Sequence, residues 1–154
     1  MKPNMSYRKL IPCIYIAGGK AIKWFNDREI LADNAVELAK HYSDLGADEL
    51  LIFDLSDSDE DHEAALNLLR QIHNVISIPM VAGGNIKRIE DVQRILFSGA
   101  KRAILNFSKP DSADMMAEAA SRFGKEKVAV SLDDFDGLFK HQHLIEDNCS
   151  ELIF

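Results

Sequence analysis

Short apolar runs bounded by small or polar residues recur along the chain and predict buried strands. The first, residues 9–17 (KLIPCIYIA), is too short for a typical helix and closes on Gly18 and Gly19. Later runs of the same kind occupy residues 48–54, 75–82, 101–106 and 127–133. A last run at residues 151–154 predicts the opening of a sixth strand.

Apolar residues at helical spacing separate these runs. After a mixed connection at residues 21–31, Asp33 or Asn34 can cap a helix, with Glu37 as the capping-box partner of Asn34, and Gly46 predicts the helix end. Further helices are predicted from the acidic run 57–61 through His73, from 87 to 97 and from 111 to 123. Residues 134–148 are polar and show no long helical period.

Strand and helix thus alternate four times, which is typical of parallel βα units with right-handed crossovers. One α/β architecture that fits is a partial (β/α)₈ (TIM) barrel of about five βα units ending on a sixth strand, because a complete barrel needs at least ~200 residues. The alternative is an open, flavodoxin-like parallel sheet. Both place functional residues at the carboxyl ends of the strands, and 154 residues suffice for one domain, 1–154.

Composition and charge narrow the range of partners. The net charge is −7, which argues against nucleic-acid and membrane-surface partners. No apolar run approaches the ~20 residues needed to span a bilayer, and the first residues (MKPNMSYRKL) lack the apolar segment of a signal peptide. Cys13 and Cys149 form no metal-ligand pattern. We therefore expect a reduced, cytoplasmic protein without a metal or another cofactor.

Polar and small residues at the predicted strand ends are the candidate site. They are Tyr15, Asp54, Gly83-Gly84-Asn85, Asn106 with Ser108, and Asp133. A Gly-Gly turn that opens into a helix lets backbone N–H groups approach a phosphate, although such a turn also serves plain chain reversal. Asn106 and Ser108 follow the neighbouring strand and are uncharged donors suited to phosphate oxygens.

The titratable residues give weaker signals. Asp54 and Asp133 can act as acid or base only where burial or neighbours tune their pKa values; otherwise they cap turns. His141 and His143 would share one face of a strand, but no third metal ligand is evident. The remaining histidines are expected on polar helix faces. They are His41, His62 and His73.

At these strand ends the chain resembles the histidine-biosynthesis phosphosugar barrels, namely the cyclase subunit of imidazole glycerol phosphate synthase and the related ProFAR isomerase. The segments that carry the resemblance are KLIPC (9–13), DELLIFD (48–54), IPMVAGG (78–84) and GAKRAILN (99–106). The likeness keeps its register over residues 8–137. It implies a barrel fold, a phosphoribosyl-type ligand held by Gly83, Gly84, Asn106 and Ser108, and Asp133 as a catalytic residue.

Departures from the family pattern bear on catalysis. The family has an essential aspartate where this chain has Tyr15, and a phenol with an ordinary pKa near 10 is a poor base at neutral pH. Asn85 replaces the third glycine of the phosphate loop, and Phe107 replaces a Thr or Ser. The resemblance therefore implies a non-catalytic or degenerate phosphosugar-binding domain. The alternatives are an active cyclase or isomerase on a phosphoribosyl-aminoimidazole carboxamide, and a structural partial barrel that self-associates.

Two expectations concern partners. The open edges of a partial barrel invite pairing, so a homodimer or higher oligomer is expected unless further domains downstream supply the missing strands. Residues 9–15 (KLIPCIY) also resemble the N-terminal region of clostridial-type bifunctional phosphoribosyl-AMP cyclohydrolase/phosphoribosyl-ATP pyrophosphohydrolase proteins. That resemblance implies that such domains follow in the natural chain.

Overall fold

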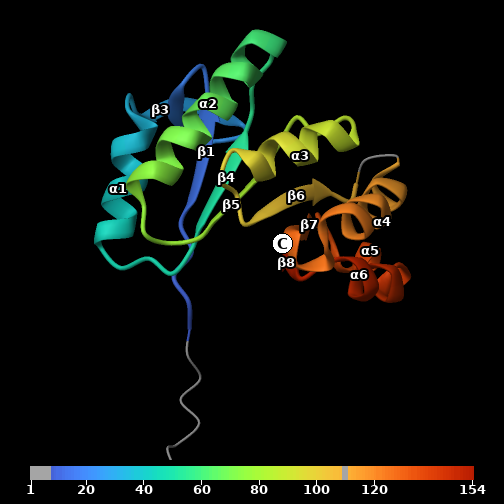
Figure 1. The fold of residues 1–154 in the computed structure, drawn as a ribbon. Coiled ribbons are helices and arrows are strands. Elements are labelled where there is room, and N and C mark those ends of the chain that lie inside the picture. Colours follow the sequence, from blue (N-terminus) through green and yellow to red (C-terminus); the bar gives the residue numbers. More distant parts are fainter. Residues whose placement is uncertain (1–7, 109–110) are drawn as a thin grey trace, which may run out of the picture.

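The computed structural model describes residues 8–108 and 111–154, which form one curved sheet with helices packed on its outer face (Figure 1). The strands are β1 (Cys13–Ala17), β2 (Lys20–Trp24), β3 (Asp27–Ala32), β4 (Leu50–Asp54), β5 (Met80–Gly83), β6 (Arg102–Asn106), β7 (Val128–Ser131) and β8 (Glu151–Ile153). The helices are α1 (Ala35–Asp44), α2 (Asp59–Val75), α3 (Ile89–Phe97), α4 (Ser112–Phe123), α5 (Phe135–Lys140) and α6 (Gln142–Asn148), with a 3₁₀ turn at Lys125–Lys127.

The strands lie side by side in the order β3-β2-β1-β4-β5-β6-β7-β8. From β1 through β4 to β8 the neighbours are parallel, whereas β2 and β3 add an antiparallel hairpin beside β1. A parallel sheet whose spatial order follows the chain order, with helices on one face, is the arrangement of a (β/α)₈ barrel and not of a doubly wound sheet. The predicted partial barrel is confirmed, and the flavodoxin-like alternative is wrong.

Three stretches differ from the prediction. The strand predicted at residues 75–82 is shorter, since Val75 still belongs to α2 and β5 begins at Met80. The expected mixed connection at residues 21–31 instead forms most of the β2–β3 hairpin, in which Ile22 pairs with Ile30. The expected polar stretch at residues 134–148 folds into α5 and α6, two helices too short to show a long period. The prediction that His141 and His143 share a strand face is wrong, because His141 precedes α6 and His143 lies within it.

Alternating side chains give the sheet two apolar faces. In β4, Leu50 and Ile52 are buried against the helices, while Leu51 and Phe53 pack on the inner face. The inner apolar cluster also contains Val81, Ile104, Ala129 and Ile153. This alternation is what a barrel wall requires, since every strand must be apolar on both sides.

The longest helix, α2, begins where the acidic run predicts. Ser58 caps it by accepting the N–H of Asp61 at 3.1 Å, and acids fill the first turn, where they complement the helix dipole. Within the described ranges, none of the helices combines the length and apolarity needed to cross a membrane.

Candidate functional site

The carboxyl ends of the parallel strands surround a cavity of about 590 Å³, which we call the mouth cavity. Its lining comes from the ends of β4, β6 and β7, from the turns after β4 and β5, from the start of α4 and from β3. The lining residues are Arg28, Phe53, Asp54, Leu55, Ser56, Gly84, Asn85, Ile86, Lys87, Ile104, Leu105, Asn106, Asp111, Ser112, Met115 and Ser131. Of the predicted site residues, four are brought together here: Asp54, Gly84, Asn85 and Asn106. The predicted residues outside this lining are Tyr15, Gly83, Ser108 and Asp133.

The Gly83–Gly84 pair lets β5 and its turn approach both neighbouring strands. A Cβ on Gly83 would come within 2.7 Å of Ile104, and a Cβ on Gly84 would overlap the carbonyl oxygen of Asp54. Gly84 also has φ +96°, a backbone conformation that favours glycine. Close packing of the backbone therefore requires both glycines, whatever else the turn binds.

Asn85 holds the turn against the end of β4. Its φ is +56°, and its side-chain amide donates to the carbonyl oxygens of Asp54 at 3.3 Å and Ser56 at 3.1 Å. The turn does not open directly into a helix as predicted, because α3 starts at Ile89. The carboxylate of Asp91 then accepts the N–H groups ahead of that helix, so they are not available to a ligand.

Asn106 presents its amide at the mouth. Its Oδ1 accepts the N–H of Ser108 at 3.0 Å, which leaves the Nδ2 group as a donor for a ligand. Two cationic side chains, Arg28 and Lys87, line the same cavity. Arg28 is held by the Leu55 carbonyl at 3.2 Å and by Asp57 at 3.3 Å. One amide and two cations are a donor set suited to a phosphate.

Tyr15 lies on the inner face of β1 and is enclosed by aromatic rings. Its ring stacks on Phe53 at 5.7 Å between centroids and meets Trp24 edge-on at 5.2 Å. Burial, together with the adjacent Cys13, raises the pKa of the Tyr15 phenol to about 12. Desolvation likewise raises the pKa of the Cys13 thiol to about 11, although Cys13 is exposed at the surface. Both groups keep their protons at neutral pH, so neither can act as a base there.

The two predicted aspartates have different surroundings. Asp133 is exposed and accepts a hydrogen bond from the Ser108 hydroxyl. Asp54 is buried, and its Oδ2 lies 2.5 Å from Nδ1 of His62. The expectation of His62 on a polar helix face is wrong, since its side chain is 13% exposed. The pairing of Asp54 with His62 leaves only a weak signal in the sequence, namely an aspartate at a strand end and a histidine eight residues later in the first turns of a helix.

No metal site emerges from the described residues. Nowhere in 8–108 or 111–154 do three or more His, Cys, Asp and Glu side chains lie close enough together to hold an ion.

The fold and the mouth define a partial (β/α)₈ barrel with its polar groups at the carboxyl ends of the strands. The model of the histidine biosynthesis protein family matches residues 9–150, and the chain belongs to that family. The resemblance noted at the strand ends is thereby confirmed.

Curated relatives give the same assignment. Over 130 residues the chain is 33% identical to the imidazole glycerol phosphate synthase subunit HisF of Flavobacterium psychrophilum. It is 30% identical to the same subunit of Sulfolobus acidocaldarius and 32% identical to that of Sulfurisphaera tokodaii. Each alignment covers 84% of this chain and 52% of the relative, so the chain spans about half the length of these relatives.

Proposed function

We propose that this chain is a non-catalytic phosphosugar-binding barrel domain of histidine biosynthesis. The observation that carries the proposal is Tyr15: at the position where the family has an essential aspartate, the chain holds a phenol whose pKa is raised to about 12. Asp133 then has no acidic or basic partner on the first strand. Membership of the family supports the pathway, and the donors of the mouth cavity support binding of a phosphate.

In this proposal the ligand is a phosphoribosyl-type molecule. Asn106 Nδ2 and the ammonium of Lys87 contact its phosphate, while Arg28 adds positive charge at the rim. The inner-face ring of Phe53 gives the remainder of the ligand an apolar surface. Gly83, Ser108 and Asp133 act indirectly, Gly83 through strand packing and Ser108 through its hydrogen bond to Asp133.

Two other functions have some support. An active cyclase or isomerase would use Asp133, whose exposure leaves it accessible to a substrate. Self-association, as a homodimer or higher oligomer, is favoured by exposed aromatic side chains at both ends of the sheet, Trp24 and Phe25 on one side and Phe154 stacked on Phe135 on the other. Sedimentation over a range of protein concentrations tests self-association, and a monomer at high concentration would exclude it.

Ligand binding can be tested by titrating ¹⁵N-labelled protein with ribose 5-phosphate. We expect chemical-shift changes at Gly84 and at the side-chain amide of Asn106. Asn106→Ala should weaken binding about tenfold, because a hydrogen bond to a charged group is lost. The control is Asn67→Ala, an exposed residue of α2. Unchanged affinity in the Asn106 variant, or no response at Gly84, would remove the binding proposal.

A further inference from the structure

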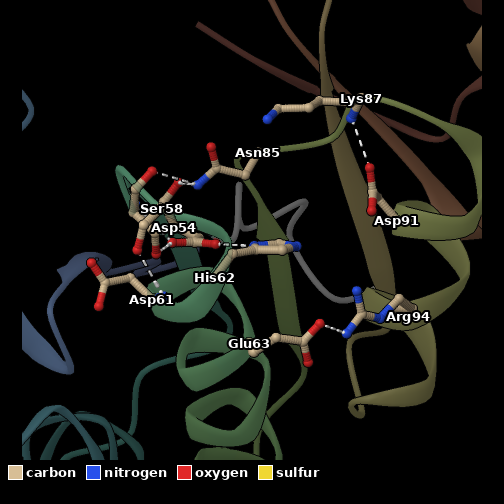
Figure 2. Close-up of polar contacts among 10 residues, drawn as sticks. Asp54, Ser58, Asp61, His62, Glu63, Asn85, Lys87, Asp91 and Arg94 are labelled. Atoms are coloured by element: carbon tan, nitrogen blue, oxygen red, sulfur yellow. Dashed lines mark hydrogen bonds and ion pairs between the residues drawn. The ribbon is translucent and has the colours of Figure 1, made fainter.

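A second cavity, of about 670 Å³, lies between the N-terminal ends of α2 and α3, and we call it the outer cavity. Its lining consists of Ser56, Asp57, Ser58, Asp59, His62, Glu63, Asn85, Lys87, Arg88, Asp91 and Arg94. It shares Ser56, Asn85 and Lys87 with the mouth cavity. Figure 2 shows the ring of His62 with one edge toward Asp54 and the other toward the space between Lys87 and Arg94.

Asp54 fixes the orientation of His62. One carboxylate oxygen of Asp54 accepts the N–H of Ser56 at 2.9 Å and also its hydroxyl, while the other lies 2.5 Å from His62 Nδ1. A carboxylate that only accepts requires the hydrogen on Nδ1. In the neutral imidazole, Nε2 is then left as the acceptor.

Nε2 of His62 is buried and has no hydrogen-bond partner among the described residues. Such an atom is unfavourable in a folded protein, so a bound group that donates to it would be stabilised. The neighbouring ion pair between Glu63 and Arg94 is substantially exposed, with 57% and 36% of the side chains accessible. Exposed pairs of this kind contribute little stability, so they can move aside for a ligand.

The charges around the outer cavity favour an anion. Most of its acidic side chains already have partners: Asp57 has Arg28, Glu63 has Arg94, and Asp91 accepts the N–H groups of Lys87 and Arg88. The side chains of Lys87 and Arg88, in contrast, form no ion pair with any described residue. Asp59 is the remaining acid of the lining.

We propose that the outer cavity is a second site, which binds a phosphate group. Lys87 and Arg88 neutralise the phosphate, and Nε2 of His62 accepts a hydrogen bond from a hydroxyl. That hydroxyl belongs either to the phosphate itself or to a sugar that carries it. Asp54 acts as a positioning residue, because it holds the imidazole without contacting the ligand. Lys87 lines both cavities, so His62 and Arg88, which line the outer cavity alone, distinguish this site from the mouth cavity.

Histidine-selective ¹⁵N NMR tests the site directly. Titration with ribose 5-phosphate, and separately with inorganic phosphate, is expected to shift His62 Nε2 while Nδ1 stays protonated. Tighter binding of ribose 5-phosphate would identify the sugar as the source of the hydroxyl, and tighter binding of inorganic phosphate, which keeps a P–OH group at neutral pH, would identify the phosphate. His41, exposed on α1, is the internal reference and should not respond.

Two variants separate this site from the mouth cavity. Arg88→Gln should weaken the His62 response about tenfold, since a charge-assisted hydrogen bond is lost, whereas Arg122→Gln on α4 should leave it unchanged. Asn106→Ala should abolish the response at Gly84 and keep that at His62. The proposal is overturned if Nε2 does not respond to either ligand, or if Arg88→Gln leaves the response intact. Arg88 is exposed, so this result does not depend on whether a His62 variant folds.

Discussion

The guanidinium of Arg102 lies 3.0 Å from the carboxylate of Glu151 and joins β6 to β8 at the end of the sheet opposite the mouth. A second carboxylate, that of Glu49 beside β4, lies 3.6 Å from the same guanidinium. All three side chains are at least four-fifths buried. One arginine on β6 therefore neutralises two acids, one beside β4 and one on β8, that would otherwise repel each other.

Replacing Arg102 should destabilise the fold. Arg102→Met leaves Glu49 and Glu151 buried without a cation, and we expect a loss of about 3 kcal/mol in the free energy of unfolding. Urea denaturation at pH 7 measures this loss, which should shrink as the pH falls and Glu151, whose pKa is raised by burial, becomes protonated. The matched control is Arg122→Met, which removes an exposed pair with Glu118 and should cost about 0.5 kcal/mol or less. Equal losses in both variants would contradict the role of Arg102.

Glu151 should make stability depend on pH. Burial, and then the nearby Glu49, raise the pKa of Glu151 above its ordinary value of 4.5, so the folded state binds this proton more tightly than the unfolded state. The contribution of Glu151 is therefore fully present below about pH 4.5 and is lost as the pH rises through the folded-state pKa. Glu151→Gln should remove this component. Comparing the free energies of unfolding of both proteins from pH 4 to 8 checks the sign, with Glu118→Gln as the control. A Gln variant that follows the wild-type curve would contradict the assignment.

The inner face of β1 should resist deprotonation. The pKa of Cys13 is raised from 9.0 to about 11, and that of Tyr15 from 10.0 to about 12. Each group therefore stabilises the fold fully below its ordinary pKa, and this contribution is lost as the pH rises through its raised pKa. Absorbance of tyrosinate is expected to show one late transition, absent in Tyr15→Phe. Thiol alkylation at pH 8 should be slow until the protein is unfolded, because the thiolate is the reactive form. Rapid alkylation of Cys13 in the folded protein would show that the thiol is not protected.

The turn after β5 should tolerate no side chain at Gly84. Gly84→Ala places a Cβ against the Asp54 carbonyl and strains a backbone at φ +96°, so we expect a loss of about 3 kcal/mol or a failure to fold. Gly46→Ala is the control: its φ is +90°, but nothing lies within 4 Å of the added Cβ. Its loss should be about 1 kcal/mol, from backbone strain alone. Thermal unfolding of the two variants separates packing from strain, and similar melting temperatures would show that packing at Gly84 is unimportant.

The barrel wall could be predicted from the sequence because each of its strands is a short apolar run that ends in a small or polar residue. The β2–β3 hairpin could not, since residues such as Trp24, Ile30 and Leu31 are 48–56% exposed and show no clean alternation. Helices α5 and α6 were missed for a different reason. With six and seven residues, they are too short to display a helical period.

Some features of the candidate site could likewise be predicted from the sequence, and others could not. Gly84 and Asn106 could be placed at the mouth because parallel strands bring their carboxyl ends to one edge. The pairing of Asp54 with His62 could not be foreseen, because it depends on how the loop between β4 and α2 folds back. For the pair Gly83–Gly84, the sequence pattern indicated a phosphate loop. The packing of Gly83 on Ile104 and of Gly84 on Asp54 accounts for both glycines without a ligand.

Restoring the family's first-strand acid tests the proposed loss of catalysis. The unmodified chain is expected to form no imidazole glycerol phosphate in an assay in which HisF of Flavobacterium psychrophilum is the positive control. We expect Tyr15→Asp to be necessary for such activity but not sufficient, because the carboxylate would lie against Phe53 and Trp24, and burying it there costs about 1–3 kcal/mol. Tyr15→Phe keeps the ring packing and serves as the control for folding. Turnover by the unmodified chain would show that Asp133 works without an acid on β1 and that the domain is an enzyme.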